Sequence, residues 1–171
     1  MTKRLSILLL AIFTASMFGW AGAWAKRKPS TPEDRAKAVQ WAHQLEAEPL
    51  SDDAFSKRKW LINWYEKVPD ITVVVCDLLG PSPKDEHPLF AVILSQMLFS
   101  NGAFQIEHPD KAGDRVAVQT AGLEAALNVY ETLVKEIPEG RLPFLDDLLA
   151  KRAQGHLTEF VKEGTATGCG D

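Results

Sequence analysis

Hydrophobic residues recur with helical spacing along most of this chain, most clearly between residues 115 and 137. There the inward positions are separated alternately by four and three residues, which is typical of a helix that packs lengthwise against another helix. Asp114 is suited to cap the start of this helix, and Pro138 is suited to end it. The seam positions are Val116, Thr120, Leu123, Leu127, Tyr130, Val134 and Ile137.

Two further helices are predicted in the N-terminal half of the chain. Thr31 is a good N-cap, Pro32 fits the first helical position, and Pro49 ends this first helix. Ser51 or Asp52 is then expected to cap a second helix that runs to about residue 68. Aromatic residues at helical spacing are more often core than ligand site, so we expect the tryptophans of this region in the core: Trp41, Trp60 and Trp64.

The segment from 89 to 106 is apolar on nearly all sides, which predicts a central core helix. We expect it to be too short and too polar for a membrane span. Asn101-Gly102 within it could break the helix or let a neighbour pack closely. A loop over 107–114 follows, and the chain ends with two short helices hinged near Gly155.

The stretch "VPDITVVVCDLLGPSP", residues 68–83, fits two local structures. Its β-branched residues alternate as in a strand, but Ile71, Val74, Val75 and Leu78 also fall on one face of a helix. A lone strand needs a partner, and no other run combines alternation with hairpin turn residues. We therefore predict a short buried helix here, starting after Pro69.

Together these elements predict an all-α fold: a single bundle-like domain of five to seven helices, preceded by a signal peptide. The helical domain is expected over 26–171, with a short linker at 26–30 and a flexible tail at 164–171. The composition, 46% hydrophobic and 25% charged, is that of a globular protein.

Residues 1–25 have the pattern of an export signal. Lys3 and Arg4 precede an apolar stretch, and the segment ends in small residues suited to a signal peptidase. Cleavage is expected after Ala25, with Ala23 as a second frame. The alternative is an uncleaved N-terminal membrane anchor, since residues 5–25 carry no charge. We thus expect an exported protein, periplasmic or secreted, with no membrane association after cleavage.

The two cysteines, Cys76 and Cys169, are expected to form a disulfide in an oxidising compartment. The alternative is one buried thiol and one thiol in a frayed tail. No histidine lies near Cys76 in the sequence, so a thiolate–imidazole catalytic site is the least favoured reading.

Charge and motifs restrict the classes of function. A net charge of −4 argues against nucleic acid as the main partner, because phosphate binding needs clustered lysines and arginines. The pairs His43–Glu46 and His156–Glu159 have one-turn spacing, but their order is the reverse of the Glu-x-x-His motif of di-metal bundles. We predict no metal, no cofactor and no catalytic residue, since standard catalytic signatures are missing from the sequence.

One loop is a candidate for function. Glu107, His108 and Asp110 cluster between two predicted helices, and polar loop residues often serve binding or catalysis. A turn before Pro109 explains them equally well. They are therefore held only as weak candidates for a functional loop.

The segment "AALNVYETLVKEIP" resembles the second helix of a tetratricopeptide repeat, with Ala126, Tyr130, Leu133 and Pro138 at that family's spacing. The resemblance covers about half of one repeat, and it implies an interaction scaffold with a concave surface. Our leading hypothesis is a non-catalytic exported protein of interaction or structural type, such as a stress-response module, with another protein as its partner. The alternatives are this helical-repeat scaffold and an enzyme with its site near Glu107 and His108.

Overall fold

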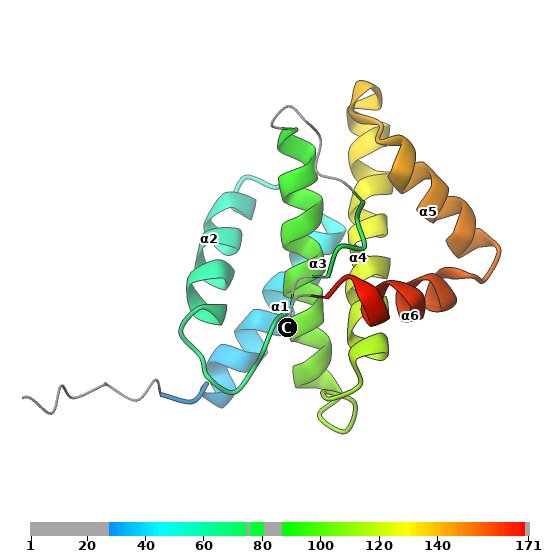
Figure 1. Cartoon of the computed structure of the whole chain (residues 1–171). Coiled ribbons are helices and arrows are strands. Elements are labelled where there is room, and N and C mark those ends of the chain that lie inside the picture. Colours follow the sequence, from blue (N-terminus) through cyan, green and yellow to red (C-terminus); the bar gives the residue numbers. More distant parts are fainter. Residues whose placement is uncertain (1–27, 75, 81–86, 170–171) are drawn as a thin grey trace, which may run out of the picture.

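A computed structural model describes residues 28–74, 76–80 and 87–169, and the chain folds there into an all-α domain (Figure 1). The predicted signal segment 1–25 lies outside the described residues. The helices are α1 (Pro32–Ala47), α2 (Ala54–Tyr65), α3 (Pro88–Glu107), α4 (Arg115–Glu136), α5 (Pro143–Ala153) and α6 (Leu157–Thr167), with a short 3₁₀ turn over Pro138–Gly140. The predicted fold class is confirmed.

Several predicted helix boundaries are correct for the predicted reason. The hydroxyl of Thr31 accepts a hydrogen bond from the Asp34 N–H, and Asp114 accepts one from the Ala117 N–H. Gly155 separates α5 from α6 with φ +76°, a left-handed conformation that glycine adopts without steric cost. Each of these is a local signal, readable without knowledge of the rest of the fold.

Three boundaries were predicted wrongly, and one of them is the end of the second helix, which lies at Tyr65 rather than near residue 68. The second helix begins at Ala54 with Asp53 in the N-cap position, after Ser51 and Asp52, and the Asp53 side chain makes no capping bond. At the other end, α6 continues to Thr167, so residues 164–167 of the predicted flexible tail are helical. The close contact of Gly164 with Leu78 holds this last turn against the body.

The helix predicted after Pro69 is also wrong. Residues 71–74 and 76–80 form an extended, irregular segment across the core. Side chains of neighbouring helices bind its backbone: Gln105 donates to the Thr72 carbonyl and Gln119 to the Val74 carbonyl. The Asp77 N–H donates to the Gly168 carbonyl. With its polar groups satisfied in this way, the segment needs no regular secondary structure.

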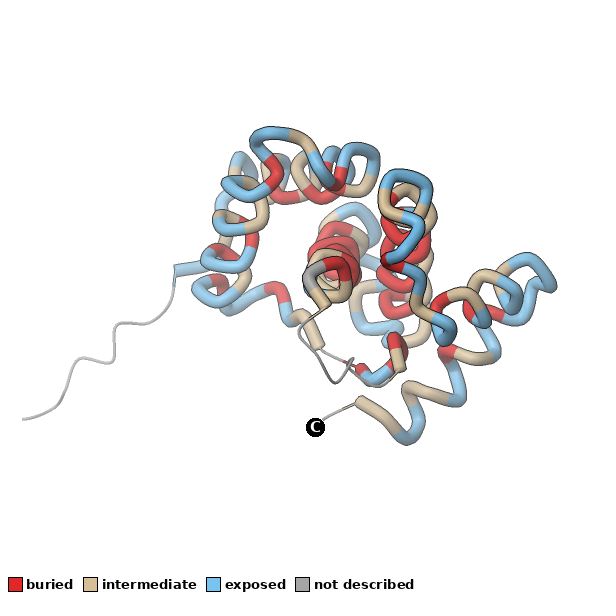
Figure 2. Tube along the Cα trace, turned by 90° about the horizontal axis from the view of Figure 1, so that it is seen from above, coloured by how far each residue is buried: buried red, intermediate tan, exposed pale blue. Residues whose placement is uncertain are grey.

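Helix α3 is the centre of the molecule (Figure 2). It packs along α4 and also contacts α1 and α2. By length and composition α3 could cross a membrane, contrary to our expectation, but half of its most apolar stretch is buried inside the molecule. Asn101-Gly102 does not break α3; instead Gly102 gives room to the ring of Tyr65.

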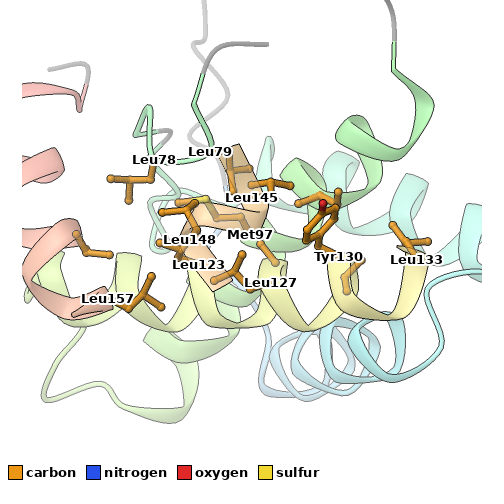
Figure 3. Close-up of a cluster of buried hydrophobic side chains, with 14 of the residues drawn as sticks. Leu78, Leu79, Met97, Leu123, Leu127, Tyr130, Leu133, Leu145, Leu148 and Leu157 are labelled. Carbon is orange, nitrogen blue, oxygen red and sulfur yellow. The ribbon is translucent and has the colours of Figure 1, made fainter. Parts of the chain in front are cut away.

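Two hydrophobic cores lie on different faces of α3. The larger joins Ile93 and Met97 of α3 to α4, α5, α6 and the extended segment (Figure 3). The smaller joins Phe99 and Ala103 of α3 to α1 and α2. The seam predicted for 115–137 supplies much of the larger core, where its inward members are Leu123, Leu127 and Tyr130.

Cys76 and Cys169 form a disulfide, as predicted from the sequence. The two residues also form an isolated antiparallel bridge. Through this contact the end of α6 is attached to the extended segment. Ile71, Leu78 and Leu79 of this extended segment are buried.

The tetratricopeptide resemblance does not extend beyond α4. A repeat array needs helix pairs of similar length, whereas α1 to α6 have 16, 12, 20, 22, 11 and 11 residues. The residues that carried the resemblance serve the core instead. Ala126, Tyr130 and Leu133 are fully buried in it.

Candidate functional site

A hollow lies where α1, α3 and α4 meet, and we call it the α1–α4 hollow. It consists of two open depressions of about 140 Å³ and about 410 Å³, both lined by His43, Glu46 and Asn128. Binding sites for drug-sized ligands usually have roughly 300–1,000 Å³ in a more enclosed form, so the smaller depression suits a single side chain. The lining residues are His43, Glu46, Ala47, Ser100, Ala103, Phe104, Glu107, Ala121, Glu124, Ala125, Asn128 and Thr132.

The floor and the rim of the α1–α4 hollow differ in character. Ala103 and Ala125 are buried, and such small side chains leave an apolar depression between the helices. Carboxylates stand at the rim, one from each of three helices: Glu46, Glu107 and Glu124. The hollow therefore combines an apolar floor with an acidic edge.

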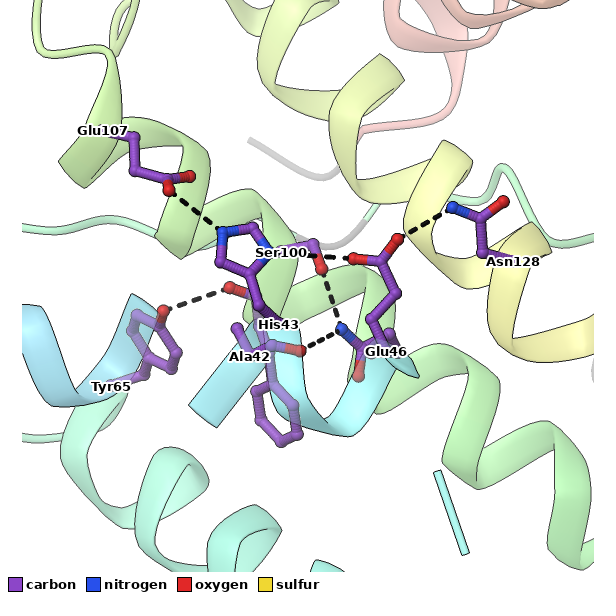
Figure 4. Close-up of polar contacts among 9 residues, drawn as sticks. Ala42, His43, Glu46, Tyr65, Ser100, Glu107 and Asn128 are labelled. Carbon is purple, nitrogen blue, oxygen red and sulfur yellow. Dashed lines mark hydrogen bonds and ion pairs between the residues drawn. The ribbon is translucent and has the colours of Figure 1, made fainter. Parts of the chain in front are cut away.

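The imidazole of His43 lies between two of these carboxylates (Figure 4). Its Nε2 is 3.0 Å from Glu107 Oε1 and donates the hydrogen of this bond, because a carboxylate oxygen can only accept. Its Nδ1 is 4.0 Å from Glu46 Oε2, too far for a hydrogen bond. The His43 side chain is 56% exposed, so a partner can reach it.

A polar network continues from Glu46 across the surface. Asn128 of α4 donates to Glu46 Oε1 at 2.8 Å and accepts at 2.9 Å from Arg152 of α5. Arg152 also donates to Glu131 at 2.6 Å and lies 3.7 Å from Glu124. Helices α1, α4 and α5 are thus joined by one chain of charged and amide groups.

The loop candidates fall in different places. Glu107 is the last residue of α3 and belongs to the hollow. His108 ends α3 through its N–H to the Phe104 carbonyl, and its ring packs on Phe104 at 4.6 Å. Asp110 is exposed in the following turn. The partner of Glu107 is His43, not His108, and the sequence pointed to that histidine only through its spacing to Glu46.

Within the part of the chain that the structure describes, no group of three His, Cys, Asp or Glu side chains is placed to hold a metal ion. Two other polar residues, Asp146 and His156, take part in the fold. Asp146 accepts from Tyr130 and Arg141, and His156 occupies the N-cap position of α6. The chemistry of this surface is therefore concentrated at the α1–α4 hollow.

Comparison of the chain with models of known protein families, with curated proteins and with solved structures found no match. The function must consequently be argued from the geometry of the hollow.

Proposed function

We propose that this chain is an exported, non-catalytic interaction protein that binds a cationic side chain of a partner protein in the α1–α4 hollow. The observation that carries the proposal is the position of His43 between the carboxylates of Glu46 and Glu107. Each of these carboxylates has further lone pairs that can accept hydrogen bonds from an entering cation. A lysine or arginine entering there would bind both carboxylates and lay its methylene groups on the alanine floor.

The chain contains an internal example of such binding. Arg152 from α5 reaches the same surface and binds Asn128 and Glu131 beside Glu124. The Arg152 side chain is only 22% exposed, so most of it packs against the protein surface. The carboxylates of Glu46 and Glu107 continue this acidic surface, and among the described residues neither pairs with an arginine or a lysine.

The proposal includes export by the segment 1–25, with cleavage after Ala25. The disulfide between Cys76 and Cys169 supports an oxidising compartment, because such bonds persist mainly in exported proteins. Intact mass of the protein recovered from the cell envelope would test it. A chain that begins at Lys26 is expected; retention of residues 1–25 in a membrane fraction would favour the anchor instead.

Partner capture tests the binding proposal. The tagged protein and its Glu46→Gln/Glu107→Gln variant would be expressed for export, cross-linked in place and compared by mass spectrometry. We expect at least one partner to be strongly depleted with the variant, because the neutral amides keep the shape of the hollow but remove its charge. The matched control is Glu136→Gln/Glu163→Gln, which removes two exposed carboxylates outside the hollow.

The same capture experiment has a clear negative outcome. Equal recovery of every partner with the hollow variant and with the control would contradict the proposed site. No partner under any condition would contradict an interaction role altogether.

The pairing of His43 with Glu107 favours an enzyme as the second candidate. A carboxylate that accepts from one imidazole nitrogen orients the other nitrogen as a general base. Hydrolysis of a panel of esters, amides and phosphate esters would test this role. Turnover that is lost in His43→Asn and kept in His108→Asn would favour the enzyme over the interaction protein.

A further inference from the structure

The outer face of α2 is unusually apolar for an exposed helix. Phe55 is 78% exposed and Ile62 is 47% exposed, and Leu50, just before the helix, is 53% exposed. In the described part of the chain only one other large hydrophobic side chain is exposed, Phe144 at 37%. Single exposed hydrophobic residues are ordinary, but α2 presents two, and Leu50 adds a third in the turn before the helix.

Two charged residues share this face with the apolar ones. Phe55, Lys59, Ile62 and Glu66 are spaced by four, three and four positions, and at 100° per residue they fall within a stripe about 60° wide. All four are exposed, and the backbone at Glu66 (φ −64°, ψ −25°) still follows the helix. Among the described residues, neither Lys59 nor Glu66 takes part in an ion pair. We call this stripe the α2 face.

We propose that the α2 face binds the α2 face of a second copy of this chain, forming a symmetric antiparallel dimer. The pattern is self-complementary: when a twofold axis passes between Ile62 and Asn63, each Lys59 meets Glu66 of the second copy. Each Ile62 then lies beside its own counterpart. The Lys59–Glu66 contacts and the Ile62 contact form in the same register, whereas Phe55 lies beyond the end of the second copy's α2 in this arrangement.

The charges on the α2 face argue for this occupant over others. A face for an anionic membrane would carry basic residues alone, whereas this one carries Lys59 and Glu66 together. The residues that line the α1–α4 hollow come from α1, α3 and α4, so the dimer leaves the hollow open. The proposal therefore stands independently of the proposed function.

The dimer is expected to be weak. Helix α2 has 12 residues and is about 18 Å long, so one helix pair buries less than the roughly 800 Å² per partner of a standard interface. Sedimentation velocity over a range of concentrations should show a reversible monomer–dimer equilibrium. Ile62→Lys should raise the dissociation constant about tenfold or more.

Charge swapping tests the register. Lys59→Glu alone places glutamates opposite Glu66 of the second copy, and Glu66→Lys alone places lysines opposite Lys59; each variant should be more monomeric than wild type. An equal mixture of the two variants should form a heterodimer, because both contacts are then attractive. The double variant Lys59→Glu/Glu66→Lys should also dimerise. Lys162→Glu, at an exposed lysine of α6, is the matched control and should behave as wild type.

These variants change exposed residues, and circular dichroism can verify that each remains folded. A wild-type protein that stays monomeric at all concentrations would overturn the proposal. So would a dimer that persists in Ile62→Lys, or single variants whose mixture gains nothing. Cosedimentation of a monomeric protein with vesicles containing anionic lipid, lost in Ile62→Lys, would assign the face to a membrane instead.

Discussion

Gly122 of α4 lies directly against the side chain of Asn101 of α3, so the two central helices meet where a Cβ atom has no room. A Cβ built at Gly122 would also be 2.7 Å from the carbonyl oxygen of Met97. Asn101 is fully buried, and its amide donates to Gln119, which restricts its freedom to move aside. The close packing of α3 on α4 thus depends on a glycine.

We predict that Gly122→Ala lowers the free energy of unfolding by about 1–3 kcal/mol through overpacking. Alanine's better helix propensity offsets up to about 1 kcal/mol of this, so a net loss means that the steric clash dominates. Urea denaturation measures the change. Gly113→Ala is the control, because a Cβ there meets nothing within 4 Å. Equal free energies of unfolding for the two variants would show that α3 and α4 can move apart to admit the Cβ atom without loss of stability.

Removal of the disulfide should destabilise the protein substantially. The 93-residue separation of Cys76 and Cys169 limits the stabilisation to about 4–5 kcal/mol in the chain-entropy description, with smaller values common. We expect Cys76→Ala/Cys169→Ala to lower the free energy of unfolding by about 2–4 kcal/mol. Denaturation of the wild type with and without reductant provides the comparison. A double variant as stable as the oxidised wild type would contradict the prediction.

Asp70 should contribute acid-sensitive stability. Its partial desolvation alone would raise the pKa of the carboxyl, but hydrogen bonds from the Ser30 N–H and hydroxyl and from Arg35 outweigh this and hold the pKa at about 2. Because the folded pKa is below the unfolded value of 3.8, the contribution is present above pH 3.8 and is lost as the pH falls towards 2. Asp70→Asn should lower stability at neutral pH and flatten its dependence between these values.

The measurement for Asp70 is urea denaturation at several acid pH values. Asp110→Asn, at an exposed aspartate of the 108–114 loop, serves as the control and should retain the pH dependence of the wild type. If the stability of Asp70→Asn depends on pH as strongly as that of the wild type, the contacts of Asp70 with Ser30 and Arg35 are not a source of acid sensitivity.

The hydroxyl group of Tyr130 should add to the stability that its buried ring provides. Its hydroxyl accepts from the Leu142 N–H at 2.8 Å and donates to Asp146 at 2.9 Å. Tyr130→Phe keeps the packing but leaves the N–H without its acceptor, so we expect a loss of about 1–3 kcal/mol. Asp146→Asn keeps the Leu142 contact and should cost less. A larger effect from Asp146→Asn would place the main contribution on the carboxylate.

The same residue predicts behaviour in alkali. Burial raises the pKa of Tyr130 above 10, and the charge of Asp146 adds to this. A raised pKa means that the contribution to stability is complete below pH 10 and is lost as the pH rises through the folded value. The free energy of unfolding of Tyr130→Phe should therefore fall less steeply with rising pH than that of the wild type, as measured by urea denaturation at several alkaline pH values.

The helical signals that were correct are those decided within one helix: the cap at Thr31, the glycine at 155 and the seam of α4. The segment after Pro69 failed because its conformation is decided elsewhere. Gln105, Gln119 and Gly168 bind its backbone, and all three are distant in sequence. The β-branched residues of the segment favour extended structure. An extended segment does not need a neighbouring strand when side-chain amides bind its backbone, and these partners could not be predicted from the sequence.

The candidate site was foreseen only in part. Glu107 could be singled out because it stands in a polar loop, but its contact with His43 spans 64 positions and depends on how α1 crosses α3. Asn128 and Arg152 gave no signal, since exposed amides and arginines on helices are common. The pairing of charged groups on different helices needs the tertiary arrangement.

The disulfide divides the molecule by connectivity as well as by packing. The bond between Cys76 and Cys169 closes a covalent ring that contains α3 to α6 and the larger core. Helices α1 and α2 lie outside that ring and are retained by the smaller core and by polar contacts. Partial opening therefore has a preferred direction: α1 and α2 can detach together while the ring stays compact, and their amide hydrogens should exchange with solvent before those of α4.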